Sequence, residues 1–265
     1  IVDAMAVVNA YDAHAQYFEN LAPEQIQFKE QFEQCFGLSG AASCENIEKI
    51  FAKKLADNPN DELIVSQAYN LLARTGCTTD FFFTVGEKYY SMQPSASVAM
   101  ALAQGFQDKG AFDKANQYLR EALAVEENAA EREKLYVRIG ILDMSTNNFA
   151  SAVAAFRDAQ AINPENAHVP FFLAQCYVNG AKNCSGLAKD AIYWVAYDLI
   201  QKALPLLEVS DPERVDAAKQ LASAYRAAFP TAEECFFNEV AEGSSYTVNC
   251  GFAQGVSTVV RPRAK

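Results

Sequence analysis

Two basic residues, Lys134 and Arg138, are spaced so that both side chains could contact one charged ligand. They lie four residues apart in a stretch with helical periodicity, so both side chains would lie on one face of a helix. Two cations held in this way offer electrostatic recognition of a ligand rather than a reaction. The alternative is that both are hydrated on a solvent-facing helix, as charged side chains usually are.

Residue types that carry out catalysis do not form a reactive arrangement. The chain has only two histidines, His14 and His168, and no spacing links them to acidic ligands, so no metal site is expected. A cysteine nucleophile would need a partnering base, which neither histidine provides in a recognisable pattern. Phosphate-binding glycine loops, the G-x-S-x-G elbow and zinc-protease motifs do not occur. The sequence therefore predicts a protein that is not an enzyme and uses no cofactor.

Seven cysteines are many for a cytosolic protein of this size, and none forms a C-x-x-C pair. Cys44, Cys77 and Cys184 fall in predicted turns or insertions, and Cys235 and Cys250 fall near the C-terminus. This placement suits disulfides that link loops, which indicates an oxidising compartment. Buried free thiols packed among small residues are the alternative. Because the count is odd, at least one thiol is free or pairs elsewhere.

The overall composition is that of an ordered soluble protein, with 51% hydrophobic and 21% charged residues in 265. A net charge of −11 and a pI near 4.7, without a lysine or arginine cluster, argue against nucleic-acid binding. No apolar stretch is long enough to span a bilayer. Because the chain begins at Ile1 rather than Met, we expect a trimmed or processed product, and any signal peptide or lipid anchor would lie upstream.

The elements that would position these residues are visible as an internal repeat between Ser95 and Asn166. Apolar, small and turn residues recur there with a displacement of 37 residues, close to the period of about 34 expected for helix–turn–helix repeats. The recurring pairs are Leu102 and Ile139, Ala103 and Gly140, Phe106 and Asp143, Gly110 and Asn147, Ala115 and Ala152, Leu119 and Phe156, Ala122 and Ala159, and Leu123 and Gln160. Gly110 and Asn147 are residues that tolerate a positive φ at the turn inside each repeat.

Residues 1–230 are predicted to form an array of such helix pairs, because one pair cannot bury both of its apolar faces without stacking on the next. The predicted parts are N-terminal helices in 1–36, a partial repeat at 44–59, repeats at 62–94, 96–128, 133–166 and 167–208, and a capping helix at 211–228. The repeat at 167–208 is longer than the others by a ten-residue insertion around Asn179–Lys189.

The C-terminal residues 231–265 change their period from helical to alternating. A period of two residues in the sequence pattern around Phe236–Phe237, Tyr246–Val248 and Val256–Val260 predicts a small antiparallel β meander. A meander this short cannot stand alone, so we expect it to pack on the last helices.

This pattern resembles the tetratricopeptide repeat, most specifically in 96–128 and 133–166, and the resemblance covers most of the chain. Glu127 replaces the closing proline, and Asp143 stands where an aromatic residue is usual. The order of segments is also similar to tetratricopeptide proteins of the Bacteroidetes cell envelope, through CEN at 44–46, TGCT at 75–78, AIYW at 191–194, FP at 229–230 and SSYTV at 244–248. The resemblance implies an all-α, right-handed α-superhelix and an extracytoplasmic location in a bacterium, in the periplasm or at the outer membrane.

In such arrays the first helix of each pair lines a concave groove in which ligands usually lie. The repeat phase places eight candidate residues there: Asn70, Met100, Gln104, Lys134, Arg138, His168, Phe171 and Gln175. Asn70, Lys134 and Arg138 match three positions of the clamp with which some tetratricopeptide domains hold a terminal carboxylate, whereas Ser66 and Ala101 replace the other two. Phe171 could contact a ligand, or pack with Phe172 inside the repeat.

Cysteine pairs can be proposed from the turns that the array brings together. The three pairings are Cys44–Cys77 at equivalent turns of adjacent repeats, Cys176–Cys184 at the insertion, and Cys235–Cys250 on neighbouring β segments. These leave Cys35 alone, and a Cys35–Cys44 bond across the short loop at 37–43 competes with the first pairing.

Together these features predict a non-catalytic scaffold that binds a protein or peptide segment in the helix-lined groove. A surface protein that binds glycans or nutrients on a similar repeat scaffold is the alternative, and it predicts an exposed aromatic platform. The single tryptophan, Trp194, falls in a predicted buried helix and does not suit that platform. An enzyme with an unrecognised site is the remote alternative.

Overall fold

Short polar side chains define where several helices of the repeat region begin. In the computed structural model, which describes residues 4–15, 17 and 23–263, Asp61 accepts hydrogen bonds from the backbone of Leu63 and Ile64. Asn128 does the same for Ala130 and Glu131. These caps satisfy backbone N–H groups that have no partner inside the helix, so the helix starts are set locally.

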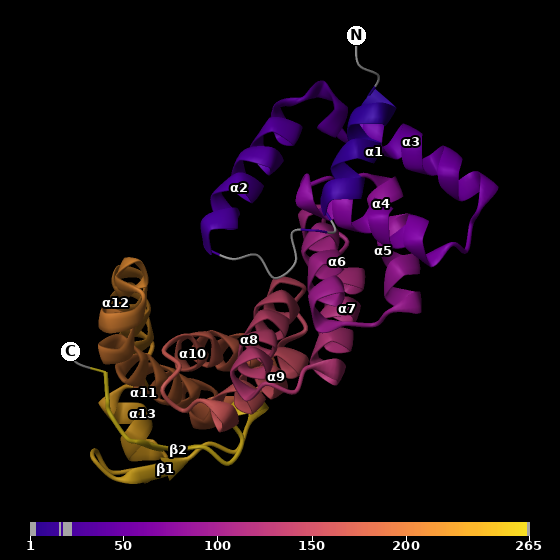
Figure 1. Ribbon diagram of the computed structural model, residues 1–265. Helices are drawn as coiled ribbons and strands as arrows, with labels where there is room; N and C mark the ends of the chain where they lie inside the picture. The colour runs from indigo at the N-terminus through magenta and orange to yellow at the C-terminus, as the bar shows by residue number, and fades with distance from the viewer. Residues whose placement is uncertain (1–3, 16, 18–22, 264–265) are drawn as a thin grey trace. The chain divides into compact units, whose positions relative to one another are not determined.

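The chain folds as two compact units, Ile1–Val125 and Glu126–Lys265. The helices of the first unit are α1 Ala4–Ala15, α2 Pro23–Leu38, α3 Cys44–Asp57, α4 Glu62–Arg74, α5 Asp80–Met92, α6 Ala96–Asp108 and α7 Phe112–Val125 (Figure 1). A 3-10 turn, η2 at Gly40–Ala42, precedes α3. Within this unit α4 pairs with α5 and α6 pairs with α7.

The second unit continues with helix pairs and ends in the C-terminal segment. Its helices are α8 Ala129–Ser145, α9 Phe149–Ile162, α10 His168–Gly180, α11 Gly186–Ser210, α12 Val215–Ala227 and α13 Ala232–Phe237. Three short 3-10 turns are η3 Ala181–Asn183, η4 Pro212–Arg214 and η5 Gly251–Ala253, and two strands are β1 Ser245–Thr247 and β2 Ser257–Val259. Helix α8 pairs with α9, α10 with α11, and α11 with α12.

The turn inside three successive helix pairs uses the same backbone conformation. Gly76, Gly110 and Asn147 have φ values of 68°, 74° and 63° between the paired helices. Glycine adopts this left-handed region without a steric cost, and asparagine is the next most tolerant residue. The prediction for Gly110 and Asn147 is therefore confirmed.

Small residues lie where neighbouring helices approach each other closely. A Cβ atom on Gly140 of α8 would lie 2.5 Å from the ring of Phe156 on α9, and one on Gly86 of α5 would lie 2.7 Å from Leu102 on α6. Phe156 and Leu102 are both fully buried. The repeat is thus a pattern of small residues that accept large ones from the neighbouring helix.

The C-terminal segment differs from the predicted meander at its start. Phe236–Phe237 do not form a strand; they end the short helix α13, which begins at a capping box between Thr231 and Glu234. The remaining two segments pair as an antiparallel sheet with Tyr246 opposite Thr258. Figure 1 shows these strands in yellow beside α11 and α13.

Helix α11 supports the C-terminal segment. The indole Nε1 of Trp194 donates a 2.7 Å hydrogen bond to the backbone oxygen of Arg261. Asp198 accepts a hydrogen bond from Thr258 at 2.6 Å and forms an ion pair with Arg261 at 2.9 Å. The sheet is thus attached to the helix by a buried indole and by a half-exposed carboxylate.

Candidate functional site

Lys134 and Arg138 lie on α8 as their spacing predicts. The Lys134 side chain is 64% exposed, and its ammonium lies 2.7 Å from the carboxylate of Glu131, one turn earlier. The hydrogen bond and the charge of Glu131 raise the pKa of Lys134, so it is a cation throughout the neutral range. Because both partners are exposed, this ion pair contributes little to stability, and a ligand carboxylate could replace Glu131.

A single asparagine attaches the start of α10 to α8. The side-chain oxygen of Asn166 accepts hydrogen bonds from the backbone of His168 at 2.8 Å and Val169 at 3.3 Å. Its amide nitrogen donates to the carboxylate of Glu133 on α8, which is buried. The first turns of α8 and α10, the first helices of successive pairs, are therefore fixed to each other.

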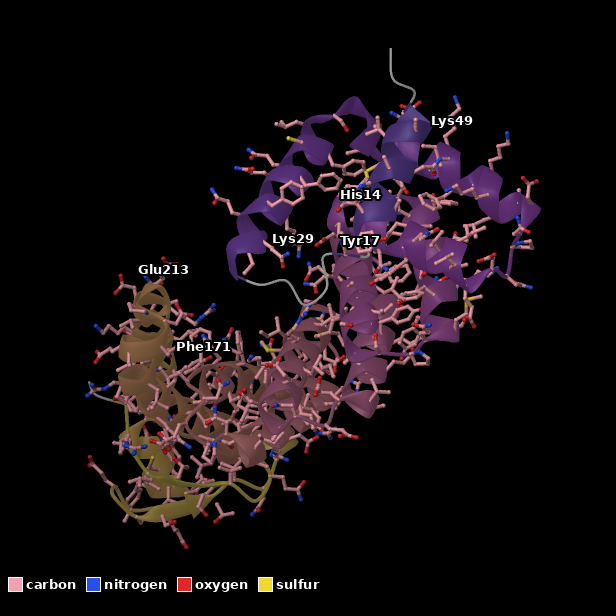
Figure 2. The ribbon with its side chains drawn as sticks, in the orientation of Figure 1. His14, Tyr17, Lys29, Lys49, Phe171 and Glu213 are labelled. Atoms are coloured by element: carbon pink, nitrogen blue, oxygen red, sulfur yellow. A yellow bond between two sulfur atoms is a disulfide. The ribbon has the colours of Figure 1, made fainter. Side chains whose placement is uncertain are left out.

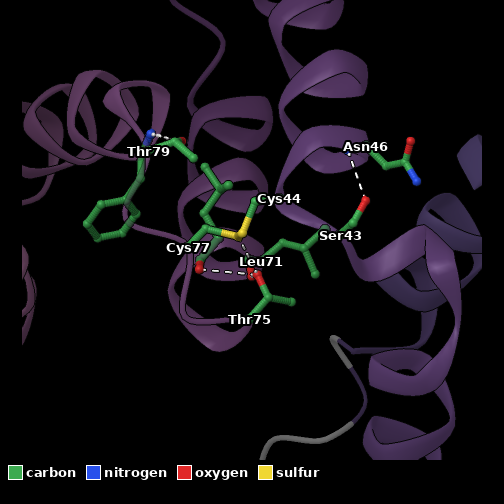
Figure 3. The surroundings of a disulfide bond; sticks show 9 residues. Ser43, Cys44, Asn46, Leu71, Thr75, Cys77 and Thr79 are labelled. Carbon is green, nitrogen blue, oxygen red and sulfur yellow. Dashed lines mark hydrogen bonds between the residues drawn. A yellow bond between two sulfur atoms is a disulfide. The ribbon is translucent and has the colours of Figure 1, made fainter.

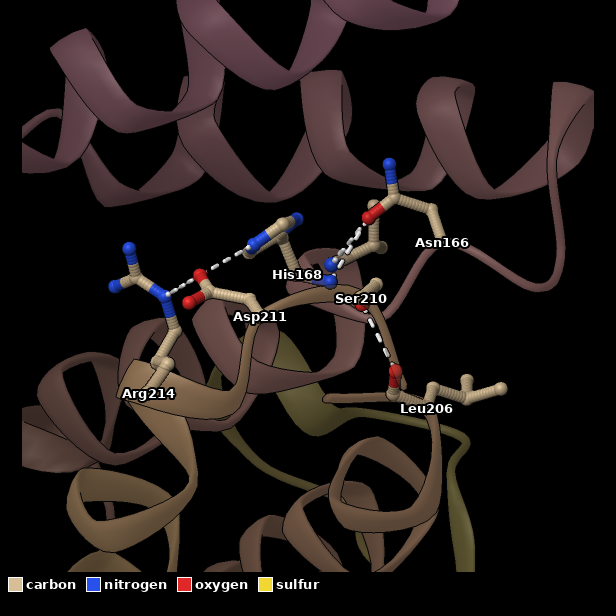
Figure 4. Close-up of polar contacts among 7 residues, drawn as sticks. Asn166, His168, Leu206, Ser210, Asp211 and Arg214 are labelled. Carbon is tan, nitrogen blue, oxygen red and sulfur yellow. Dashed lines mark hydrogen bonds and ion pairs between the residues drawn. The ribbon is translucent and has the colours of Figure 1, made fainter. Parts of the chain in front are cut away.

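His168 continues this polar array toward the connector between α11 and α12 (Figure 4). Its ring nitrogen Nε2 lies 2.9 Å from Oδ2 of Asp211, and the same oxygen accepts from Nε of Arg214 at 2.9 Å. The hydrogen bond from His168 and, to a smaller extent, the one from Arg214 lower the pKa of Asp211 below its ordinary value of 3.8. The array therefore holds an ionised carboxylate between two donors.

Aromatic rings beneath this array belong to the core. The guanidinium of Arg214 lies over the rings of Phe171 and Phe172, at 5.5 and 5.6 Å from their centroids. Phe171, labelled in Figure 2, is only 5% exposed and packs with residues of α11 and α12. The structure therefore supports repeat packing for Phe171 and corrects the expectation that it could anchor a ligand.

The other predicted groove residues lie on the expected helices. Gln175 is half-buried on α10, and its amide nitrogen donates to the backbone oxygen of Phe171 at 3.2 Å. In the first unit, Asn70 of α4 is exposed and Met100 of α6 is half-buried. Gln104, also on α6, donates to Asp108 at 2.9 Å. The candidate groove residues thus fall into two groups. Those on α8 and α10 lie in the second unit, and those on α4 and α6 lie in the first unit.

Two disulfides link turns of the chain. Cys44 bonds to Cys77, the first of the predicted pairings, and the two lie 33 positions apart in the sequence (Figure 3). The Thr75 hydroxyl donates to the backbone oxygen of Leu71 at 2.8 Å, in the turn that carries Cys77. This bond joins the start of α3 to the turn after α4.

The other two cysteine pairings predicted from the sequence, Cys176–Cys184 and Cys235–Cys250, are wrong. Cys184 instead bonds to Cys250, 66 residues away, while Cys35, Cys176 and Cys235 are free. Cys176 and Cys235 are buried in the core of the second unit, and Cys35 is exposed on α2. Burial raises the pKa of the Cys176 thiol to about 12, so it stays protonated. The expected Cys235–Cys250 pair assumed neighbouring strands, but Cys235 lies on a helix.

A hollow of about 570 Å³ lies where the insertion meets the C-terminal segment. Its lining is rich in carboxamides and carries one cation: Asn147, Asn148, Phe149, Ala150, Ser151, Asn179, Gly180, Lys182, Asn183 and Phe252. The ring of Phe252 rests on Gly180, where a Cβ atom would lie 2.2 Å from it. Arg157 also donates to the backbone oxygen of Phe252 at 2.9 Å. The wall formed by Phe252 is therefore fixed by both α9 and α10.

Two features of other functional classes, a metal-ligand cluster and a membrane-spanning helix, are absent from the described residues. No three His, Cys, Asp or Glu side chains come together there as metal ligands. His14, at the end of α1 (Figure 2), bonds through its ring to the backbone oxygen of Ala10. No helix in the described ranges is both long enough and apolar enough to cross a membrane.

Sequence reasoning missed Asp211, Arg214 and Asn166. Asn166 precedes α10 by two residues, and an asparagine in that position is a recognisable cap signal. Asp211 lies 43 residues after His168, and no local pattern links two residues at that separation. The contact forms only because α10 and α11 pack as a pair.

The helix pairs, with their left-handed turn residues and their small-to-large packing, define a tetratricopeptide-repeat fold. No protein-family model matches the sequence, and no curated protein matches it. Among solved structures, the crystal structure of MamA is 14% identical, with a TM-score of 0.48, over 72% of this chain and 98% of that one. YrrB, a tetratricopeptide-repeat protein with an unusual peptide-binding site, is 15% identical with a TM-score of 0.39, over 75% of this chain and 98% of that one.

A third similar structure is the C-terminal part of a tetratricopeptide-repeat protein from Cytophaga hutchinsonii. It is 18% identical, with a TM-score of 0.40, and the alignment covers 78% of this chain and 80% of that one. The helix pairs of the chain and their left-handed turns are themselves what define the fold.

Proposed function

We propose that this protein is a non-catalytic scaffold that binds a peptide or protein segment along the first helices of its second unit. The observation that carries the proposal is the bond from Asn166 to Glu133, which fixes α10 against α8. The helices that hold Lys134, Arg138 and His168 therefore form one preorganised surface, and a ligand need not order it.

The ligand that suits this surface ends in a free carboxylate. Lys134 is already paired with a carboxylate, that of Glu131, in an exposed bond that is weak in water. A terminal carboxylate held by the rest of its peptide would replace Glu131 and gain the same charge-assisted hydrogen bond. Asp211 satisfies both His168 and Arg214, so these residues shape the surface rather than supply its free charge.

We also propose that the protein works in an oxidising, extracytoplasmic compartment of a bacterium, in the periplasm or at the outer membrane. The Cys44–Cys77 and Cys184–Cys250 disulfides support this location, because such bonds persist mainly outside the reducing cytosol.

The test of the binding surface is a titration with a fluorescent peptide library in two matched forms, one with free C-terminal carboxylates and one amidated. We expect peptides that bind with a free C-terminal carboxylate to lose affinity when they are amidated. Their affinity should also fall about tenfold for the Lys134→Ala/Arg138→Ala variant. Glu131→Gln should tighten binding, because it removes the competing carboxylate. Lys202→Ala/Lys219→Ala is the matched control, since both lysines are exposed on α11 and α12 and the change in net charge is the same. Equal affinity for both peptide forms would contradict the proposal.

A second candidate function is favoured by the hollow beside Phe252. Its four asparagine amides can donate and accept hydrogen bonds, and no carboxylate is among its lining residues. Such a lining suits a neutral hydroxyl-rich ligand such as a glycan. Trp194 takes no part, because it is fully buried. Calorimetry with a panel of neutral oligosaccharides tests this candidate: heat of binding that is lost in Asn179→Ala and kept in Lys134→Ala supports it.

A further inference from the structure

The end of α13 exposes two adjacent phenylalanines. Phe236 is 78% exposed and Phe237 is 73% exposed. Their rings meet edge to face, with centroids 6.0 Å apart and planes at 69°. The two rings therefore contact each other while leaving most of their apolar surface in water, an arrangement that marks interaction sites more often than isolated exposed residues do.

The support beneath these rings is fixed. The side chain of Thr231 accepts from the backbone of Glu234, and the carboxylate of Glu234 accepts from the backbone of Thr231, which locks the start of α13. Cys235, between these groups and the rings, is 3% exposed in the core, and its backbone oxygen accepts from Val240 at 3.0 Å. The exposure of the rings is thus a property of an anchored helix.

Exposed carboxylates flank the ring pair in the sequence. Glu233, Glu239 and Glu242 are exposed, and within the described part of the chain none of the three forms an ion pair or a side-chain hydrogen bond. Burial, and after it the charges of Glu234 and Glu242, raise the pKa of the Cys235 thiol, so Glu242 lies near the base of α13. These three carboxylates are therefore open to a cationic partner, while the charge of Arg263 acts on the neighbouring Glu234.

We propose that Phe236, Phe237, Glu233, Glu239 and Glu242 form a docking surface, the aromatic–acidic surface, for a basic and apolar segment of a partner protein. An apolar side chain of the partner would cover the rings, and its lysines or arginines would pair with the carboxylates or lie over the ring faces. A membrane suits this surface less, because the carboxylates repel anionic headgroups. Rings at 69° also do not provide the flat platform on which a sugar stacks.

This proposal is independent of the carboxylate site on α8, which shares no residue with it. The probes are three short fluorescein-labelled peptides: one alternates lysine with leucine, one lysine with serine, and one glutamate with leucine. We expect the lysine–leucine peptide to bind most tightly, the lysine–serine peptide about tenfold more weakly, and the glutamate–leucine peptide not at all. Binding should weaken as salt is added.

Two variants assign the binding to this surface. Phe236→Ser/Phe237→Ser should weaken binding of the lysine–leucine peptide about tenfold. Glu233→Gln/Glu239→Gln/Glu242→Gln should abolish the salt dependence of that binding. Val209→Ser is the matched control, because Val209 on α11 is 86% exposed and apolar but lies outside the surface. Thermal unfolding by circular dichroism verifies that each variant is folded.

Three outcomes would overturn the proposal. The lysine–leucine and lysine–serine peptides could bind equally, which would show charge attraction alone. The serine variant could bind as the wild type does. The wild type could instead sediment with vesicles of phosphatidylcholine and phosphatidylserine, in a manner lost in the serine variant, which would assign the rings to a lipid surface.

Discussion

At the scale of single residues, Asp211 makes the folded state sensitive to acid. Its pKa is lowered in the folded protein by the hydrogen bonds from His168 and Arg214, so the folded state holds the proton less tightly than the unfolded chain. The stability that these two hydrogen bonds contribute is fully present above the ordinary pKa of 3.8. It is lost as the pH falls through the lower pKa that Asp211 has in the folded protein.

We therefore predict that Asp211→Asn lowers the melting temperature at neutral pH and has a shrinking effect below about pH 4. Melting temperatures of the variant and the wild type, measured across the acid range, should converge. Glu208→Gln, at an exposed position on the same helix end, is the control. A constant difference between the Asp211 variant and the wild type at all pH values would show that the carboxylate acts through packing rather than charge.

Gly140 tests whether small-to-large packing holds a helix pair together. An added methyl group would meet three atoms of the Phe156 ring at 2.5–2.8 Å, and that ring is fully buried. We predict that Gly140→Ala lowers the free energy of unfolding by about 1–3 kcal/mol, the usual cost of overpacking. Denaturant titration measures it.

Gly37→Ala, where no atom lies within 4 Å of the new Cβ, should instead be neutral or slightly stabilising. Combining Gly140→Ala with Phe156→Leu should recover part of the loss, since the smaller side chain makes room. An unchanged stability in Gly140→Ala would refute the packing explanation of the repeat.

The residues that could be predicted from the sequence are those whose role is local. Gly110 and Asn147 could be read as turn residues because a left-handed backbone restricts the choice of side chain. Lys134 and Arg138 could be placed on one helix face by their spacing. The pairing of Asp211 with His168 could not, because it depends on the packing of two helices whose contact no short motif encodes.

At the scale of elements, a local cap at the start of α13 overrides the strand predicted there. The alternation around Phe236 and Phe237 suggested a strand, but Thr231 and Glu234 lie three residues apart, and this spacing is that of a capping box. The local cap, not the hydrophobic pattern, decides the structure there. As a strand, the two phenylalanines would point to opposite faces; as the end of a helix they are exposed together.

The disulfide between η3 and η5 is the second element-scale feature, because it links the insertion to the C-terminal segment. Closing a loop between Cys184 and Cys250, 66 residues apart, restricts the unfolded chain by about 4 kcal/mol in the chain-entropy description. We predict that Cys184→Ala/Cys250→Ala lowers the free energy of unfolding of the second unit by about this amount.

Trp194 is a suitable probe of that loss. It is the only tryptophan, it is buried in the second unit, and its indole bonds to Arg261 in the C-terminal segment. The denaturant midpoint of its fluorescence should fall in the double variant. Cys35→Ala, which removes an exposed free thiol, should leave the midpoint unchanged; a midpoint that does not move in the double variant either would contradict the prediction.

At the scale of the whole molecule, the seven cysteines fall into three classes that alkylation can distinguish. Two disulfides use four of them, Cys35 is an exposed thiol, and Cys176 and Cys235 are buried thiols. We predict that iodoacetamide modifies Cys35 alone in the native protein, three thiols after denaturation without reduction, and all seven after reduction. Mass spectrometry of the intact chain measures this, and seven adducts without reduction would contradict both disulfides.

The Cys184–Cys250 bond has a consequence for how the chain is made. A chain that enters an oxidising compartment N-terminus first presents Cys77 33 positions after Cys44, whereas Cys184 must wait for Cys250, 66 positions later. During that wait the nearest earlier thiol is Cys176, only eight residues away, and a premature bond between them would trap the chain. Cys176 is buried in the folded protein and burial raises the pKa of its thiol, so prior packing of α10 would disfavour this bond. We therefore expect the Cys184–Cys250 bond to form after α10 has packed.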